Sequence, residues 1–240
     1  MTVHRAALLV ASPVAIAATL AGCGGPVPES VYFPLDAGHA WTYELRSEWD
    51  NAATARETRV LRTLGREALE GGDAWRRRSD SGVDYWLRAD AQGVYRVASK
   101  TDLDREPRAD PAPRFVLKAP LAVGTSWQAA TAPYLLMRRA EFPPELRHTH
   151  SSVPMTYSIE ATGVPVETRA GRFADCLRVK GVAALMLFSD PVAGWRPMPL
   201  TTTEWYCRGV GLVRLERQEP SLGSSFLTGG SLTMELVAWH

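Results

Sequence analysis

The segment Met155-Thr156-Tyr157-Ser158-Ile159-Glu160-Ala161 decides the fold class, because apolar and polar side chains alternate along it. A period of two is typical of a β-strand with one buried and one solvent-exposed face. The same alternation runs through residues 41–46, 83–88, 177–180 and 233–238. Glycine-containing turn signals separate these stretches. The chain is therefore expected to be mainly β, a curved antiparallel sheet or partial barrel with few short helices.

An internal repeat divides the chain. The pattern P-L-x-x-G-x-x-W occurs at residues 34–41 and again at 120–127. Pro-Leu begins an extended segment, Gly allows a tight turn and Trp fills the core at the start of the next strand. Unless the match is due to chance, it predicts two similar β units, 31–101 and 114–240, either packed as one sheet or duplicated. The charged, proline-rich stretch 102–113 between them is interpreted as an exposed loop or linker.

The N-terminus has the features of an export signal. A short, slightly basic start with His4 and Arg5 precedes residues 6–20, which are almost wholly apolar. This arrangement is typical of a secretory signal, and the apolar stretch is too short to span a bilayer comfortably as a helix. Residues 1–22 are therefore expected to be a signal peptide, and residues 31–240 the folded β domain.

The signal ends in Leu20-Ala21-Gly22-Cys23, which resembles the bacterial lipobox. In proteins with that motif the cysteine is acylated and the chain is cut just before it, so Cys23 is the expected lipidation site and a lipid bilayer the expected partner. The alternative is an ordinary secretory signal. Acyl chains contribute about 0.8 kcal/mol per buried CH₂, which anchors a protein without a transmembrane helix. Residues 23–30 then form a flexible tether.

The expected location is the cell envelope. The residue directly after Cys23 is Gly24, not Asp. By resemblance to lipoprotein sorting in enterobacteria, this favours the outer membrane, with the domain facing the periplasm or the surface.

The charge balance argues against nucleic acid as a partner. Removing the signal with Arg5 leaves 26 of the 27 basic side chains against 26 acidic ones, a net charge of zero. Such a chain has no field to capture a polyanion. The run Arg76-Arg77-Arg78 is an alternative anion-binding patch. On a strand, however, the outer two arginines are expected to point to solvent, while Arg77 snorkels or pairs with a carboxylate on the other face.

Three segments resemble a group of poorly characterised bacterial cell-envelope lipoproteins. They are Tyr32-Phe33-Pro34-Leu35 with Gly38 and Trp41-Thr42-Tyr43, then residues 170–179 (AGRFADCLRV), and residues 204–213 (EWYCRGVGLV). Proteins of that group carry YFPL-G-W-Y, AGxFxxCLxV and WYxxGVGLV segments in this order, and the resemblance covers most of residues 31–217. Cys207 departs from it, since a small residue is expected there. The group brings no known catalytic residues. A fold-level analogy to the lipoprotein carriers of the Lol pathway implies a curved antiparallel sheet.

Two cysteines, Cys176 and Cys207, remain once Cys23 is acylated. In an oxidising envelope an even pair indicates a disulfide. The alternative is two separate buried thiols. A catalytic cysteine is not favoured, because no histidine stands near either residue in the sequence.

No metal, cofactor or catalytic motif stands out. His148 and His150 have the i, i+2 spacing that places two imidazoles on one face of a strand. No partner ligand is placed with them, so they are interpreted as solvated loop histidines, and neither a metal nor a cofactor is expected. The nucleophile-elbow, Walker A, Rossmann and H-E-x-x-H patterns are all missing from the sequence. Carboxylates near turns are interpreted as surface charges, namely Asp80, Asp84, Glu160 and Glu167.

An apolar segment offers a candidate binding surface. Trp195 stands in the Pro- and Gly-rich stretch 192–199, interpreted as a loop, after the apolar run 182–188. An aromatic residue in a loop of this kind packs on the loop, caps a cavity or touches a membrane interface. Trp195, Phe188 and Met198 are therefore the candidate ligand-facing residues.

The expected function is that of a non-catalytic, membrane-anchored envelope lipoprotein that binds an apolar ligand or an envelope partner protein. One alternative is an envelope hydrolase with scattered catalytic residues. Another is an assembly subunit of a membrane complex, which would expose a large apolar patch.

Overall fold

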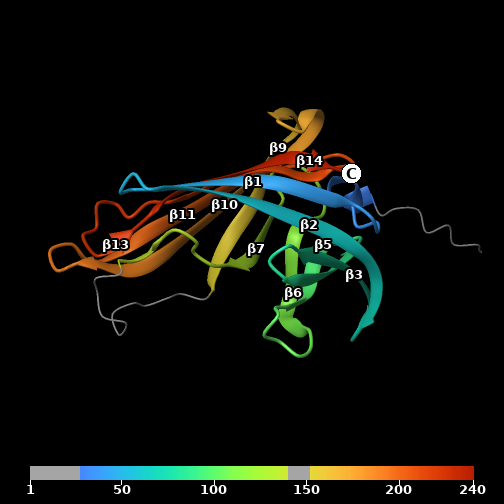
Figure 1. Cartoon of the computed structure of the whole chain (residues 1–240), viewed down its shortest axis with the longest axis horizontal. Coiled ribbons are helices and arrows are strands. Elements are labelled where there is room, and N and C mark those ends of the chain that lie inside the picture. The colour runs from blue at the N-terminus through green and yellow to red at the C-terminus, as the bar shows by residue number, and fades with distance from the viewer. Residues whose placement is uncertain (1–27, 140–151) are drawn as a thin grey trace, which may run out of the picture.

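The structure, a computed structural model, describes residues 28–139 and 152–240. The described residues begin with one turn of 3₁₀ helix, η1 (Pro28–Tyr32), and continue almost entirely as strands (Figure 1). The strands are β1 (Ala40–Trp49), β2 (Thr54–Leu69), β3 (Gly72–Ser79), β4 (Asp84–Asp90), β5 (Gly93–Lys100), β6 (Arg108–Lys118), β7 (Ser126–Thr131), β8 (Met137–Arg138), β9 (Val153–Thr168), β10 (Gly171–Asp190), β11 (Gly194–Cys207), β12 (Gly211–Glu219), β13 (Leu227–Thr228) and β14 (Gly230–Trp239).

Twelve of these strands form one sheet in the order β6-β5-β4-β3-β2-β1-β14-β12-β11-β10-β9-β7, and β8 pairs separately with β13. All neighbouring strands of the large sheet are antiparallel. The sheet curves until its edge strands β6 and β7 lie against each other. Across this seam Arg114 Nε donates to the carbonyl of Ala130 at 2.7 Å. The prediction of a mainly β chain built as a curved antiparallel sheet is confirmed.

The two copies of the P-L-x-x-G-x-x-W pattern have matching backbone roles. Gly38 and Gly124 both have positive φ, 90° and 92°, a conformation that favours glycine. Gly38 N donates to Thr63 O on β2 at 3.1 Å, and Gly124 N donates to Ile159 O on β9 at 2.9 Å. The tryptophan that ends each copy is buried. Each copy thus starts a strand, β1 or β7, and the β1–β14 pair joins the flanking strands into one sheet.

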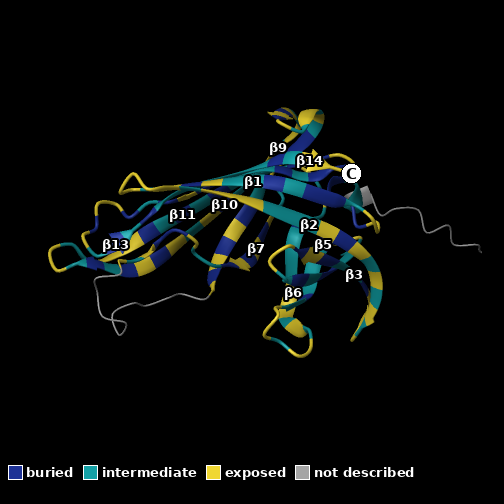
Figure 2. Cartoon of the chain, viewed as in Figure 1, coloured by how far each residue is buried: buried dark blue, intermediate teal, exposed yellow. Residues whose placement is uncertain are grey.

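The main core lies on the concave side of the sheet, where the inward-facing positions of most strands meet. The alternation of buried and exposed residues gives β9, β10 and β11 the banding seen in Figure 2. Burying a Leu, Ile or Met side chain contributes about 1.5–3 kcal/mol each. The fully buried side chains of this core include Leu117, Met155, Ile159, Leu177, Met198, Leu200 and Leu227.

The arginine run corrects one prediction. Arg77 is buried, but no carboxylate pairs with it among the described residues. Its guanidinium lies between the rings of Phe33 and Trp41, 4.3 and 4.2 Å from their centroids. Arg77 Nη2 donates to the carbonyl of Pro34 at 2.6 Å, and Nε donates to Thr63 Oγ1 at 3.2 Å. Burial lowers the pKa of Arg77 to about 10, so it is charged at neutral pH. The expected snorkelling or ion pair is replaced by aromatic stacking.

Asp84 corrects a second prediction, because it is buried rather than a surface charge. Arg78 Nε and Nη2 donate to its two oxygens at 2.8 and 2.7 Å, and Arg76 Nη2 donates to Oδ2 at 2.7 Å. Burial alone would raise the pKa of Asp84, but the two arginines outweigh it and hold that pKa below its usual value. Arg76 and Arg78 therefore cross-link β3 and β4 instead of pointing freely to solvent.

Two stretches interpreted as loops are partly strands. Residues 194–199 belong to β11 and pair with β10, and residues 108–113 belong to β6. Prolines are tolerated in both because these are sheet edges: β11 pairs with β12 only from Thr201 onward, and β6 is an edge strand. The prolines favour a loop when the sequence is considered alone. On an edge strand, however, some backbone N–H groups have no partner in the sheet, so proline is tolerated there.

Candidate ligand-binding cavity

A cavity of about 460 Å³, partly open to solvent, lies among side chains of β1, β2, β6, β7, β9, β11, β12 and β14. This volume falls within the range of small-molecule sites, roughly 300–1,000 Å³. Its apolar walls come mainly from three neighbouring strands near the middle of the sheet, β1, β14 and β12. The residues of this wall are Leu45, Trp49, Leu232, Met234, Leu212 and Leu215.

Glu204 supplies a carboxylate to this cavity opposite its apolar wall, in a lining that also contains three arginines and three tyrosines. The segment from Thr202 to Tyr206 on β11 turns Thr202, Glu204 and Tyr206 to the same face. Tyr206 Oη donates to Glu204 Oε2 at 2.5 Å, and Thr202 Oγ1 donates to Oε1 at 3.4 Å. Burial raises the pKa of Glu204, although the bond from Tyr206 and the positive charges of Arg114 and Arg217 oppose the rise. No salt bridge joins Glu204 to any residue in ranges 28–139 and 152–240.

Tyr157 on β9 lines the same cavity as Glu204. Gly181 on β10 makes room for it, because a Cβ on Gly181 would lie 2.9 Å from Tyr157 Cε1 and 2.5 Å from Thr202 Cγ2. Burial and the charge of Glu204 raise the pKa of Tyr157 to about 12, so its hydroxyl keeps its proton at neutral pH. Tyr157 and Tyr206 therefore both present O–H groups at the cavity.

Arg217 and Glu219 form a buried ion pair at another part of the cavity wall. Arg217 also donates to Thr131 Oγ1 at 3.1 Å and to the carbonyl of Ala132 at 2.7 Å. The backbone N–H groups of residues 134, 135 and 136 donate to Glu219 Oε2 at 2.9, 2.8 and 2.9 Å. Glu219 thereby fixes the segment that places Tyr134 and Leu135 on the cavity, and it neutralises Arg217.

Arg114 brings a second cation to the cavity, from the edge strand β6. Its Nε is bonded to the carbonyl of Ala130, but no carboxylate of the described residues forms a salt bridge with it. Arg59, by contrast, lies 3.6 Å from Glu57 and 3.5 Å from Asp80. Among the charged residues of the lining, Glu204 and Arg114 are the two without an ion-pair partner in the described part of the chain.

The cavity lining combines hydroxyl, carboxyl and guanidinium groups with apolar side chains. It contains no histidine or cysteine, and its hydroxyls belong to Ser47, Thr131 and the three tyrosines. A carboxyl group with a raised pKa in a cavity marks a functional-site candidate, either as a proton donor or as a recognition group. The hydroxyls, the Glu204 carboxyl group and the apolar wall are all groups that can contact a ligand.

The candidate ligand-facing residues from the sequence do not line this cavity. Met198 is fully buried in the main core. Phe188 and Trp195 face each other across the β10–β11 hairpin, with ring centroids 6.0 Å apart, and Trp195 is 64% exposed. With Val182 and Met186, which are also exposed, they put an apolar strip on the outer face of the hairpin.

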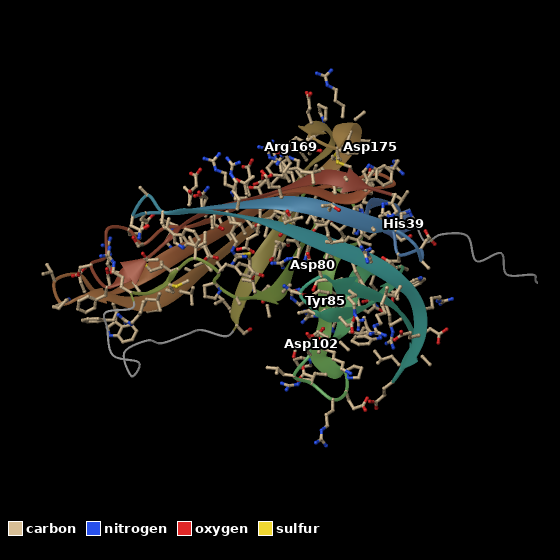
Figure 3. The ribbon with its side chains drawn as sticks, in the orientation of Figure 1. His39, Asp80, Tyr85, Asp102, Arg169 and Asp175 are labelled. Atoms are coloured by element: carbon tan, nitrogen blue, oxygen red, sulfur yellow. A yellow bond between two sulfur atoms is a disulfide. The ribbon has the colours of Figure 1, made fainter. Side chains whose placement is uncertain are left out.

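Cys176 and Cys207 are opposite each other on β10 and β11 and form a buried disulfide. Nearby, Asp175 accepts hydrogen bonds from Tyr32 Oη at 2.8 Å and from Arg208 Nε at 2.6 Å. In Figure 3, Asp175 lies toward the same end of the molecule as His39, which follows η1 in the chain. These contacts dock the start of the described chain on β10 and the β11–β12 turn.

The lipidation residue Cys23 and the histidine pair His148 and His150 lie outside the described residues. Within residues 28–139 and 152–240, no group of three or more His, Cys, Asp or Glu side chains is placed to hold a metal ion. No helix in that part of the chain has the length and apolar character needed to cross a membrane.

Comparison with known proteins gives a likeness in fold. No protein-family model matches the sequence, and no curated protein matches it. The chain is similar to the crystal structure of a predicted lipoprotein from Parabacteroides distasonis, with 16% identity, a TM-score of 0.45, and coverage of 88% of this chain and 98% of that chain. It is also similar to a predicted exported protein with a YmcC-like fold from Bacteroides fragilis, with 15% identity, a TM-score of 0.37, and coverage of 85% and 96%. At this identity and TM-score neither likeness assigns a function, so the proposals below rest on the chain's own residues.

Proposed function

We propose that this chain is an exported lipoprotein, anchored in a membrane through acylated Cys23, whose β domain binds a small amphiphile in its interior cavity without transforming it. The lipobox-like segment 20–23 supports the anchor. The resemblance of three segments to cell-envelope lipoproteins supports the location. The cavity supports the binding function.

The observation that carries the proposal is the cavity itself, a concave space of about 460 Å³ that is partly open to solvent. Small-molecule sites are concave, and they combine apolar walls with a few placed polar groups. Here the wall formed by β1, β14 and β12 is apolar, while Glu204 and Arg114 bring charged groups to the same cavity. An occupant with an apolar body and a polar head satisfies both parts of this lining, whereas a pure hydrocarbon would leave the charges without partners.

Filling the cavity tests the binding function. Ala129 lines it from β7, and the preceding residue, Gln128, is exposed and does not line it. The full acylated chain in lipid nanodiscs is titrated with a brominated alkyl amphiphile, and quenching of tryptophan fluorescence is followed, because Trp49 lines the cavity. We expect saturable quenching in the wild type and in Gln128→Phe, and its loss in Ala129→Phe. Equal quenching in both variants, with both folded by circular dichroism, would refute the cavity as the binding site.

A further inference from the structure

The charges on the cavity wall are balanced except at two positions. Arg217 is neutralised by Glu219, and Arg59 lies near Glu57 and Asp80. Glu204 and Arg114, an acidic and a basic group, have no ion-pair partner among the described residues.

Glu204 and Arg114 come from strands far apart in the chain and in the sheet. β11 is a central strand, while β6 is the edge strand that closes against β7. The charge of Arg114 acts on Glu204, yet their nitrogen and oxygen atoms do not come within the 4.0 Å of a salt bridge. The two groups therefore line the same cavity without contacting each other.

We propose that Glu204 and Arg114 together recognise a zwitterionic head group, with the ligand's ammonium at Glu204 and its anionic group at Arg114. This inference rests on the proposed function and specifies its ligand class. Glu204 offers carboxylate oxygens to N–H donors, and Arg114 has guanidinium N–H groups beyond the Nε that bonds Ala130. A ligand with a single charge would pair with one residue and leave the other unpaired, which lowers its affinity.

The size of the cavity limits the ligand. At about 30 Å³ per water-sized group, 460 Å³ holds about 15 non-hydrogen atoms. An α-amino acid head with a ten-carbon tail, 2-aminododecanoic acid, has that size. Dodecylamine and dodecanoate have the same chain length and carry one charge each. Dodecyl phosphoethanolamine has a phosphate in place of the carboxylate and represents a lipid head group. It has about five more non-hydrogen atoms, so the end of its tail extends through the open side of the cavity.

The four compounds are titrated by calorimetry into the full chain in nanodiscs, with Ala129→Phe nanodiscs as the blank for partitioning into lipid. We expect 2-aminododecanoic acid or dodecyl phosphoethanolamine to bind about tenfold or more tightly than dodecylamine and dodecanoate, since a hydrogen bond to a charged group is typically of that strength. The tighter of the two zwitterions identifies the anionic group as carboxylate or phosphate.

Two variants assign the contacts. Glu204→Gln should weaken the zwitterion and dodecylamine about tenfold and leave dodecanoate unchanged, and Arg114→Gln should weaken the zwitterion and dodecanoate but not dodecylamine. Arg46→Gln, an exposed arginine on β1, is the control and should change none of them. Equal affinity for all four compounds, or affinity that both variants leave unchanged, would overturn the zwitterion inference while leaving amphiphile binding intact. Heats identical to the Ala129→Phe blank would instead refute the proposed function.

Discussion

The hydroxyl of Tyr206 donates a 2.5 Å hydrogen bond to Glu204 Oε2 on the inner face of β11. This bond favours the ionised carboxylate, but burial disfavours it more, and the pKa of Glu204 is raised. Tyr206 lies beside Glu204 in the wall and is itself fully protonated at neutral pH, because burial raises its pKa well above the usual value. The pair is therefore most stable when Glu204 keeps its proton or when a cation neutralises it.

Glu204 makes the ligand-free protein less stable as the pH rises. A carboxyl group whose pKa is higher in the folded state binds more protons in the folded than in the unfolded protein. Its contribution to stability is therefore complete at a pH below the unfolded-state pKa, and it is lost as the pH rises through the folded-state pKa. Each pH unit within this interval costs at most about 1.4 kcal/mol. Thermal melts from pH 4 to pH 8, on delipidated protein, should show Glu204→Gln gaining stability relative to the wild type as the pH increases. If the difference in melting temperature between the wild type and Glu204→Gln were the same at every pH, this prediction would be contradicted.

Arg77 is expected to stabilise the fold mainly by packing. It fills the space between Phe33 and Trp41 and bonds the carbonyl of Pro34. Arg77→Ala should therefore cost about 3 kcal/mol or more, from the cavity and the unpaired carbonyl. Arg77→Met keeps most of the volume and should cost less than half of that, because removing the buried charge offsets part of the loss. Urea denaturation measures both.

The control for this series is Arg56→Ala, on an exposed position of β2. It should lie within about 0.5 kcal/mol of the wild type, as surface substitutions generally do. If Arg77→Ala were as mild as the control, the stacked arginine would have no stabilising role.

The disulfide between Cys176 and Cys207 is expected to stabilise the domain by restricting the unfolded chain. It closes a loop of 31 residues, for which the chain-entropy model gives about 3–4 kcal/mol. Replacing both cysteines with alanine should lower the midpoint of urea unfolding accordingly, and a reducing agent should have no further effect on that variant. A double variant as stable as the oxidised wild type would refute this contribution.

Membrane association is expected to depend on Cys23. In the proposed anchor, Cys23→Ser removes the thiol that is acylated, and without acyl chains the chain has about 0.8 kcal/mol per buried CH₂ less membrane affinity. We expect the variant to lose the acyl mass in intact-protein mass spectrometry and to change from the membrane to the soluble fraction. Ser30→Ala, in the same N-terminal region, should change neither. A Cys23→Ser protein that stayed fully in the membrane would contradict the acyl anchor.

The strands were predictable because alternation is local. In residues 155–161 each buried side chain is followed by a more exposed one, and this needs no knowledge of the neighbouring strands. The strand at 194–199 was missed because its prolines are acceptable only on a free edge, and edges follow from strand order. Strand order was not readable from the sequence, since pairing of β1 with β14 joins the two ends of the domain.

The cavity could not be predicted for the same reason. Arg114 and Glu204 share a chamber only because the sheet curves until β6 closes against β7. One local signal was available: Glu204 has the parity of Tyr206, so it is a charged residue on the inward face of a strand. Trp195 drew attention because it is a large aromatic residue in a Pro- and Gly-rich stretch, but its side chain lies on the outer face of a hairpin.

The most direct test of amphiphile binding is native mass spectrometry of the full chain extracted from the membrane of the cells that make it. We predict a non-covalently bound small amphiphile that is retained under gentle conditions and released on denaturation. Its mass should be absent from Ala129→Phe but present in Gln128→Phe. A wild-type protein that carries its acyl anchor but no such mass, and that acquires none from added amphiphiles, would contradict the claim that the cavity is a binding site.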